Sequence, residues 1–372
     1  MSTITRTDTS LVGRWWWTVD RWTLAALVAL VTLGAILSLA ATPPVAERLG
    51  FDTFHFASRQ FVFLGMALFT MLAVSLASPV AVRRTAVILF GVFFVLTAAT
   101  LIIGHEVKGA SRWIKFGSFT LQPSEFLKSS FAVVAAWMFS EGRMSASFPG
   151  ATVATALFVM VIGLLMLQPD FGMTIVVSVV YAVQFFLAGL PMLWIVLLGL
   201  VFIGCGVGAY FTFDHIQSRI DRFFDPASGD SYQVSRSMEA FMNGGWLGTG
   251  PGEGQVKAHL PDAHADFIFA VAAEEFGVFL CLIIIGIFGF IVLRGFVRIF
   301  RETDLFVLIA VTGLLVQFGL QAIINMASTL HLIPTKGMTL PFISYGGSSV
   351  LALAIGMGMV IALTRLRPGG AR

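Results

Sequence analysis

The most regular feature of the chain is a succession of long apolar runs separated by short polar segments. A helix needs roughly 20 apolar residues to cross the hydrocarbon core of a membrane, and ten runs approach that length. The pattern predicts an all-α polytopic membrane protein with about ten transmembrane helices. The predicted spans are 22–42, 60–78, 84–104, 123–140, 149–168, 172–189, 191–212, 267–293, 304–330 and 345–364.

The composition agrees with this pattern. Of the 372 residues, 57% are hydrophobic and only 12% are charged, and the mean hydropathy is +0.90. A soluble domain carries about twice that share of charged residues, so an ordinary soluble fold is excluded, and we expect no nucleic-acid partner. We expect residues 22–366 to form one membrane domain between cytoplasmic tails at 1–21 and 367–372.

Two smaller features concern the cysteines and the beginning of the chain. Cys205 and Cys281 both lie inside apolar runs, which predicts buried thiols and no disulfide between them. The first apolar run starts at Trp22 and lacks a small-residue cleavage site, so we expect no cleavable signal peptide.

The distribution of charge predicts the orientation in the membrane. Basic residues accumulate in the short loops on the cytoplasmic side. With the N-terminus inside, the inner segments hold twelve arginines against five acidic residues, and all five lysines fall outside or in the outer halves of helices. We therefore predict that both termini are cytoplasmic. The inner arginines are Arg6, Arg14, Arg21, Arg83, Arg84, Arg143, Arg294, Arg298, Arg301, Arg365, Arg367 and Arg372.

Two segments on the predicted outer side stand out. The loop His105–Gln122 carries Lys108, Arg112 and Lys115 against a single acidic residue. A basic outer loop opposes the charge rule and indicates a function. The large extracytoplasmic loop between the seventh and eighth spans, 212–265, is about 54 residues long and rich in Gly and Pro, which predicts turns and loops. Loops of this length are usually functional.

The strongest candidate for chemistry is Asp266, in the stretch 255–277. This stretch begins polar, with Lys257 and His264 among its side chains, and runs directly into apolar residues. A carboxylate at the point where water gives way to lipid is costly and is by default a candidate for function. Asp266 would be a general base or a metal ligand. The alternative is a helix N-cap that satisfies free backbone N–H groups.

Two adjacent carboxylates follow inside the same predicted span. Glu274 lies eight residues after Asp266, about 12 Å further along a helix, and Glu275 faces nearly the opposite side. Carboxylates in a span must be paired or line an aqueous cavity. A structural ion pair with Lys128 or an arginine and a role at the site are both open.

A second constellation occupies residues 112–128, R-W-I-K-F-G-S-F-T-L-Q-P-S-E-F-L-K. Its proline suits the first turn of a helix, and Glu125 can reach Lys128 on the helix surface. One interpretation is a local ion pair that lets the helix enter the membrane. The other is a cationic site in which Arg112, Lys115 and Lys128 bind an anionic group, since Arg suits phosphate geometry.

The third constellation runs from Pro334 to Ser349 and interrupts the hydrophobic pattern. Irregular backbone at membrane depth is tolerated where it lines a cavity or is buried in protein. Gly346, Gly347 and Ser348 could open a helix whose free N–H groups bind an anion; small-residue packing between helices is the alternative. The histidines show no spacing typical of a zinc site.

The three constellations together resemble the SEDS family of cell-wall polymerases. The matching runs are R-W-I-x-x-G-x-x-x-x-Q-P-S-E-x-x-K, L-P-D-A-H-A-D-F-I-F-A-V-A-A-E-E-x-G and P-T-K-G-x-x-L-P-F-I-S-Y-G-G-S-S. They occur in the family's order and spacing, and the resemblance covers about residues 20–366. The run G-T-G-P-G-E-G-x-V-K at 248–257 looks more like the cell-division members than the elongation members.

The resemblance implies a peptidoglycan glycosyltransferase that polymerises lipid II, a disaccharide-pentapeptide on an undecaprenyl diphosphate. The family's essential acidic residue matches Asp266. The family commonly has Glu where this chain has Asp262 and Thr where it has Ala265. Neither difference affects Asp266 itself, but the second removes a hydroxyl next to it. The predicted substrate-binding residues are Arg112, Lys115, Gln122, Glu125, Lys128, Lys257, His264, Glu274, Lys336 and Ser344.

The implied chemistry fits the residue types. Glycosyl transfer from a lipid diphosphate needs a base for the acceptor hydroxyl and cations for the leaving diphosphate. Asp266 suits the first role. Direct displacement of an α-linked donor would invert the anomeric carbon and give a β-linked glycan. The candidates for the second role, alone or with a divalent cation, are Arg112, Lys115, Lys128 and Lys336.

The resemblance also implies partners and a location. These are a class B penicillin-binding protein, the septal transpeptidase, together with other divisome proteins, at the bacterial inner membrane near the division septum. Two other classes stay open. A transporter that flips lipid II should carry charged residues through the full depth of the membrane, and in a non-catalytic scaffold Asp266→Ala would leave the chain's role intact.

Overall fold

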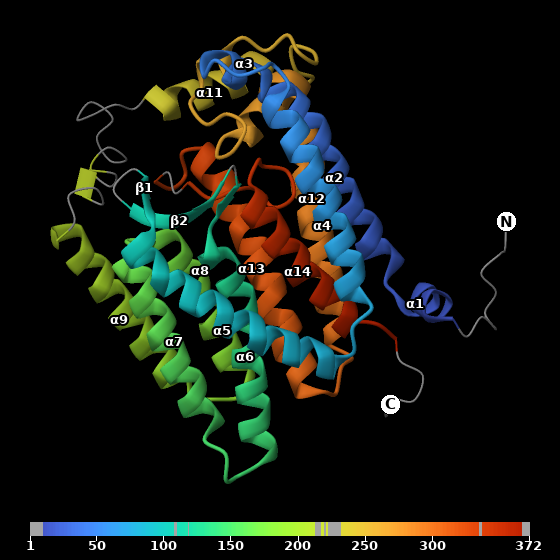
Figure 1. Ribbon diagram of the computed structural model, residues 1–372, viewed down its shortest axis with the longest axis vertical. Coiled ribbons are helices and arrows are strands. Elements are labelled where there is room, and N and C mark those ends of the chain that lie inside the picture. The colour runs from blue at the N-terminus through green and yellow to red at the C-terminus, as the bar shows by residue number, and fades with distance from the viewer. Residues whose placement is uncertain are drawn as a thin grey trace.

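The computed structural model describes residues 10–107, 110–117, 119–212, 217–218, 221, 232–334 and 337–366. Each of the ten predicted spans is a helix in this part of the chain, with ends shifted by no more than six residues (Figure 1). These helices are α2 (Arg21–Ala41), α4 (His55–Ser75), α5 (Pro79–Ile103), α6 (Pro123–Met144), α7 (Gly150–Leu167), α8 (Phe171–Leu187), α9 (Met192–Thr212), α12 (Ile268–Ile299), α13 (Leu305–Thr329) and α14 (Gly347–Leu363).

The lengths and composition of these helices confirm the predicted polytopic membrane class. Among the described residues, six helices are long and apolar enough to cross a membrane, and α8 and α14 are shorter apolar helices. α6 has the required length but carries charged side chains in its first two turns. Cys281 on α12 is buried and unpaired, as predicted, whereas the side chain of Cys205 lies outside the described part.

The centre of the bundle is formed by α6, α13 and α14. Figure 1 shows α13 and α14 between α2, α4 and α12 on one side and α7, α8 and α9 on the other. In the most apolar window of α13, 72% of the residues are buried in the protein, against 17% in α5. α6 is buried without interruption from Pro123 to Ala136. Polar residues on α6 and α13 are therefore shielded from lipid, while most of α5 faces it.

Short elements cover one end of the bundle, which we call the cap end (Figure 1). The loop predicted between the third and fourth spans contains an antiparallel sheet in the order β1-β2-β3, where Ile114 is buried against the bundle. The opposite end, which we call the base end, carries α1 and the last turn of α14. The additional elements are α1 (Leu11–Thr18), α3 (Pro43–Arg48), β1 (His105–Val107), β2 (Ala110–Phe116), β3 (Phe119–Leu121), α11 (Tyr232–Gly244) and the 3₁₀ helix η2 (Val256–His259).

A buried carboxylate joins two helices at the base end. Asp20 is 3% exposed and accepts hydrogen bonds from Nε and Nη2 of Arg294 at 2.7 and 2.9 Å, and its Oδ2 lies 2.8 Å from Nε of Arg298. It also caps α2 by accepting from Trp22 N and Thr23 Oγ1. Burial raises the pKa of Asp20, but the hydrogen bonds from Arg294 and Thr23 and the charges of both arginines outweigh burial and leave the pKa below its usual value. Asp20 is therefore ionised at neutral pH and ties α2 to α12.

Backbone groups of residues 245–250, which follow α11, replace helical hydrogen bonds that are lost at a break in α12. Gly277 has φ 77° and ψ 177° inside the helix, so the neighbouring helical hydrogen bonds are lost. Thr249 N donates to Glu274 O at 2.9 Å, and Val278 N donates to Gly245 O at 2.9 Å. Unsatisfied backbone groups are costly at membrane depth, so this segment is a structural part of α12 rather than a free loop.

We predict that Asp20→Asn lowers the melting temperature of the purified protein more than Asp304→Asn does. Asp304 caps α13 at an exposed position by accepting from Phe306 N at 2.9 Å, and Asn retains capping ability. The difference therefore isolates the ion pairs, whose loss should cost roughly 3 kcal/mol. Because the pKa of Asp20 is lowered, the stabilisation is complete above the ordinary Asp pKa, and the difference should be equal at about pH 6 and about pH 8. Equal melting temperatures for the two variants would contradict this assignment.

We also predict that Gly277→Ala destabilises the protein and that Gly286→Ala on the same helix does not. A Cβ at Gly277 would lie 2.3 Å from Trp246 O in a left-handed conformation, whereas nothing lies within 4 Å of one at Gly286. The strain at Gly277 should cost about 1–3 kcal/mol. Thermal unfolding in detergent measures both variants, and a Gly277→Ala protein as stable as wild type would show that the segment does not need this close approach.

Candidate functional site

The predicted centre, Asp266, lies at the cap end in the turn that leads into α12. Asp262 adopts φ 52°, and its carbonyl accepts hydrogen bonds from the backbone N–H groups of Ala265 and Asp266, both at 3.0 Å. α12 begins at Ile268 and its N-cap is Phe267, whose side chain makes no capping hydrogen bond. The alternative in which Asp266 is a helix N-cap is therefore wrong, because the turn places Asp266 one residue too early for that role.

The third predicted constellation packs directly against this turn. Its described residues before α14, 334 and 337–346, are non-helical, which confirms the predicted interruption. The buried Ser344 hydroxyl donates to Ala265 O at 2.6 Å and accepts from Leu340 N at 2.8 Å, and Tyr345 N donates to His264 O at 2.9 Å. Ser344 thus fastens the segment 337–346 to the Asp266 turn. A Cβ added to Gly347 would lie 2.6 Å from the Phe63 ring, so this glycine serves close packing.

An amide on α13 holds the same two segments together. Asn325 is 2% exposed, and its Nδ2 donates to Asp266 O at 3.0 Å and to Met338 O at 2.6 Å. Gly337 brings the segment next to the carboxylate, because a Cβ there would lie 3.4 Å from Asp266 Oδ2. The position of Asp266 is therefore fixed from α13 as well as from its own turn.

One turn earlier on α13, Gln321 connects the segment to the second constellation. Lys128 is 2% exposed, and its Nζ lies 2.6 Å from Glu125 Oε2 and 2.6 Å from Gln321 Oε1. The other end of the Gln321 amide donates to Thr339 O at 3.0 Å. The local Glu125–Lys128 pair that the spacing allowed is present, and it is also joined to the site.

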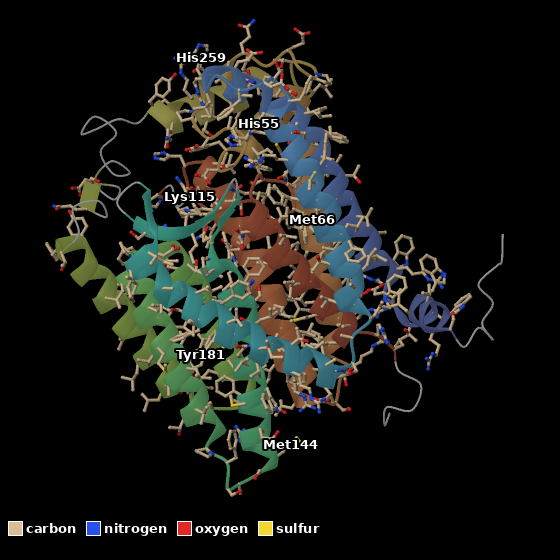
Figure 2. The ribbon with its side chains drawn as sticks, in the orientation of Figure 1. His55, Met66, Lys115, Met144, Tyr181 and His259 are labelled. Atoms are coloured by element: carbon tan, nitrogen blue, oxygen red, sulfur yellow. The ribbon has the colours of Figure 1, made fainter. Side chains whose placement is uncertain are left out.

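The other members of the second constellation diverge. The guanidinium of Arg112 donates to Gln168 O at 3.2 Å and to Pro169 O, and lies 3.6 Å from Asp170 Oδ1. Arg112 therefore fastens β2 to the turn between α7 and α8. Gln122 contributes its backbone N–H, which donates to Ser348 Oγ at the start of α14 at 3.0 Å. Lys115 is exposed on β2 at the cap end (Figure 2).

Lys257 and Glu274 are buried in a network that organises the segment after α11. Glu274 accepts hydrogen bonds from the backbone N–H groups of Val256 at 2.8 Å and Lys257 at 2.9 Å. The ammonium of Lys257 pairs with Glu275 and donates to Ala40 O at 3.1 Å. The structural ion pair considered for these carboxylates is present, with Lys257 as the partner in place of Lys128. These contacts are structural, and substrate binding by Lys257 or Glu274 stays a prediction.

His264 is packed between two aromatic rings beside the site. The centroids of Phe56 and Tyr345 lie 5.3 and 5.2 Å from that of His264. Burial lowers the pKa of His264 and so does the charge of Arg48, while Asp262 acts in the opposite direction without cancelling them. The imidazole is therefore neutral at neutral pH, and its Nδ1 is buried without a hydrogen-bond partner among the described residues.

Two predicted features are not placed by these contacts. Lys336 lies outside the described residues. For a divalent cation, no group of three His, Cys, Asp or Glu side chains in the described ranges could hold a metal ion. The described side chains therefore do not form a metal site with three such ligands.

Sequence analysis missed Gln321 and Asn325, although the sequence contains a signal for them. Gln317, Gln321 and Asn325 recur every four residues within an apolar span, which places them on one helix face. Polar residues inside a span usually face other helices and hydrogen-bond there. All three are at most 2% exposed, and two of them reach the Asp266 region.

Fold and site together define a class: a multi-pass membrane protein whose polar contacts converge at one end of a helix bundle. Residues 21–367 match the family model of the FtsW/RodA/SpoVE cell cycle proteins, and the chain belongs to this family. It is 46% identical over 366 residues to a probable peptidoglycan glycosyltransferase FtsW of Caulobacter vibrioides, covering 98% of this chain and 94% of that protein. A protein of the same name from Hydrogenovibrio crunogenus is 35% identical over 359 residues, covering 93% of this chain and 91% of that one.

Solved structures show the same architecture. A chain from a peptidoglycan synthase complex, studied for its coordination of polymerization and crosslinking, superposes with a TM-score of 0.76 at 27% identity, covering 93% of this chain and 97% of that chain. The rod shape determining protein RodA of Thermus thermophilus gives a TM-score of 0.68 at 26% identity, covering 94% and 97%. The similarity to FtsW proteins agrees with the division-type interpretation of residues 248–257.

We predict that the protein loses thermal stability as the pH falls below the ordinary histidine pKa, and that His264→Phe reduces this loss. The pKa of His264 is lower in the folded state, so the unfolded chain binds the proton more readily. The stability is therefore complete above about pH 6.5 and is lost as the pH falls towards the folded pKa. His259→Phe is the control, because His259 is exposed. Melting temperatures between about pH 7.5 and 5.5 that fall equally in the wild type and His264→Phe would contradict the role of this histidine.

Proposed function

We propose that this chain is a peptidoglycan glycosyltransferase that polymerises lipid II into glycan strands during septal cell-wall synthesis. The observation that carries the proposal is the arrangement around Asp266. Asn325 and Ser344 fix its turn against the segment 337–346, and Gln321 joins that segment to Lys128. In a chain of the FtsW/RodA/SpoVE family, these contacts link the Asp266 turn and the Lys128 ammonium to one segment, which supports the proposal.

In the proposed reaction, Asp266 is the general base. A hydroxyl oxygen of the acceptor sugar attacks the anomeric carbon of the donor and forms the new glycosidic bond. The bond from that carbon to the diphosphate oxygen breaks, the lipid diphosphate leaves with the electron pair, and the hydroxyl proton passes to the Asp266 carboxylate. Attack opposite the leaving group inverts the anomeric carbon.

The leaving diphosphate requires positive charge nearby. Lys115 is exposed at the cap end and is the most accessible described candidate. The charges of Lys128 and Arg112 are already compensated by Glu125 and Asp170, so their proposed role is to donate hydrogen bonds within an already balanced site. Lys336 lies two residues before Met338 in the sequence and is also proposed to supply positive charge to the leaving diphosphate. Any divalent cation would be carried mainly by the diphosphate itself.

The proposed orientation puts the cap end outside. The base end carries Arg294, Arg298 and Arg365, which supports its placement on the cytoplasmic side. Both termini are then cytoplasmic, in the bacterial inner membrane at the division septum. A substrate with a lipid tail and a sugar head can keep its tail in the bilayer while its head reaches Asp266.

The proposed partners are a class B penicillin-binding protein, the septal transpeptidase, and other divisome proteins. Support comes from the similar chain in a structure of a peptidoglycan synthase complex that polymerises and crosslinks. The transpeptidase would crosslink the strands that this chain makes.

We predict that Asp266→Asn and Asp266→Ala abolish polymerisation of lipid II by the purified chain with its transpeptidase partner. Loss of a general base should lower the rate by roughly 10²–10⁴-fold, which a glycan ladder on a gel would show as absence of product. Asp262→Asn is the control, since it changes a carboxylate in the same turn at a positive φ that Asn tolerates.

Each other outcome has a distinct meaning. If the Asp266 variants polymerise as wild type does, Asp266 is not the base. If the wild-type complex makes no glycan but liposomes that contain it flip labelled lipid II, the protein is a transporter. If it does neither while still binding its partner, a scaffold role is supported.

A further inference from the structure

We propose that Gln321 and Asn325 on α13 are positioning residues that set the spacing between Asp266 and Lys128. The inference rests on the proposed glycosyltransferase function, and it adds two residues that no sequence motif singled out. Each amide bonds to the segment 337–340. Gln321 also bonds to Lys128, and Asn325 also bonds to the backbone of Asp266. One helix therefore positions both the proposed base and the lysine.

Four hydrogen bonds, joined by the backbone of Met338 and Thr339, connect Lys128 to Asp266. Lys128 Nζ donates to Gln321 Oε1 at 2.6 Å, and Gln321 Nε2 donates to Thr339 O at 3.0 Å. From the neighbouring residue of that segment, Met338 O accepts from Asn325 Nδ2 at 2.6 Å, and the same nitrogen donates to Asp266 O at 3.0 Å. The two amides lie four residues apart, which separates them by about 6 Å along the axis of α13.

The orientation of both amides follows from their partners. An ammonium can only donate, so the atom of Gln321 that faces Lys128 is the oxygen, and its nitrogen then faces the carbonyl of Thr339. The nitrogen of Asn325 faces two backbone carbonyls, which can only accept. Flipping Gln321 would set donor against donor at Lys128 and acceptor against acceptor at Thr339 O, and flipping Asn325 would set its oxygen against two backbone carbonyls, so each flip breaks both bonds of that amide. The site therefore accepts each amide in only one orientation.

Burial makes these bonds obligatory. Gln321 is 0% exposed and Asn325 is 2% exposed, so water cannot replace either amide. Removal of the Asn325 amide would leave the buried carbonyl of Met338 without this donor, which is costly, and would take the same donor from the part-buried carbonyl of Asp266. The Asp266 turn and the segment 337–340 would then shift relative to α13. Because displacements of about 1 Å strongly reduce catalysis, the amide acts through the position of Asp266.

The same helix supplies a matched control. Gln317 lies one turn before Gln321 and is also 2% exposed, and its Nε2 donates to Ser129 Oγ on α6 at 2.8 Å. That bond joins two helices and touches neither the Asp266 turn nor the segment 337–340. A buried amide on this face that only supports packing should therefore behave like Gln317.

The test compares Asn325→Leu, Gln321→Met and Gln317→Met in the full chain with its transpeptidase partner. Asn325→Leu should lower kcat for lipid II polymerisation by about 10–100-fold with KM changed less than about twofold, and should move the acid limb of the pH–rate profile. Gln321→Met should raise KM, since Lys128 loses its support beside the diphosphate. Gln317→Met should keep both parameters within about twofold of wild type. Partial unfolding would scale the whole pH profile without moving its limb.

A conservative variant and a second readout complete the experiment. Gln321→Glu keeps an acceptor for Lys128 but loses the donor to Thr339, and should lie between wild type and Gln321→Met. Amide hydrogen exchange does not depend on activity. Asn325→Leu should increase exchange in both 264–267 and 338–340, and Gln317→Met should do so in neither.

The outcomes separate the two claims. If wild type is active and all three main variants lose activity in proportion to their melting temperatures, or none loses any, the positioning role is wrong and the proposed function stands. If wild type makes no glycan, the proposed function fails whatever the variants do. If wild type makes no glycan but amide hydrogen exchange in 264–267 and 338–340 still increases in Asn325→Leu, then Asn325 does hold the two segments together, but not for the catalysis proposed here.

Discussion

The hydrogen bonds that Asn325 donates to Asp266 O and Met338 O are the contacts on which the site depends. Neither the Asp266 turn nor the segment 337–346 belongs to a regular helix, and each has only a few backbone hydrogen bonds of its own, at Asp262 O and at Leu340 O. Both take their position from a helix that is itself among the most buried in the bundle. Through these two hydrogen bonds, α13 restrains the Asp266 turn and the segment 337–346.

The same physical constraint explains other parts of the structure. A membrane offers no water to an unpaired polar group, so each irregular stretch is matched by a partner in the protein. The break at Gly277 is filled by the backbone after α11, and Glu274 collects the N–H groups of Val256 and Lys257. Other buried charges are paired, Lys128 with Glu125 and Lys257 with Glu275. Arg112, Lys128 and Lys257 are therefore held in ion pairs within the protein. Among the described cations predicted for the site, the exposed Lys115 is the most accessible to an incoming anion.

The helices were predictable because span length follows from the thickness of the membrane, and all ten apolar runs form helices. The pair Glu125–Lys128 was accessible because its spacing is local. The partner of Glu275 was not, since Lys257 reaches it through a turn-rich segment whose path no periodicity indicates. The three-stranded sheet was not predicted because two of its strands have only three residues. The contacts of Asn325 and Gln321 were not predicted because their partners lie in the irregular segment before α14, whose path no periodicity indicates. The sequence left open whether Asp266 caps the helix, and the helix boundary at Ile268 places the N-cap at Phe267 instead. The role of Asp266 as a general base stays a prediction.

In the proposed reaction, the acceptor sugar meets Asp266 while the diphosphate lies towards the lysines at the cap end. An experimental structure of the chain with its transpeptidase partner and a non-reactive lipid II analogue tests this most directly. We predict an acceptor hydroxyl oxygen within about 3 Å of the Asp266 carboxylate, with Asn325 still bonded to the Asp266 carbonyl. An analogue bound with its sugars away from Asp266, or with that carboxylate turned into a contact that excludes the acceptor, would contradict it.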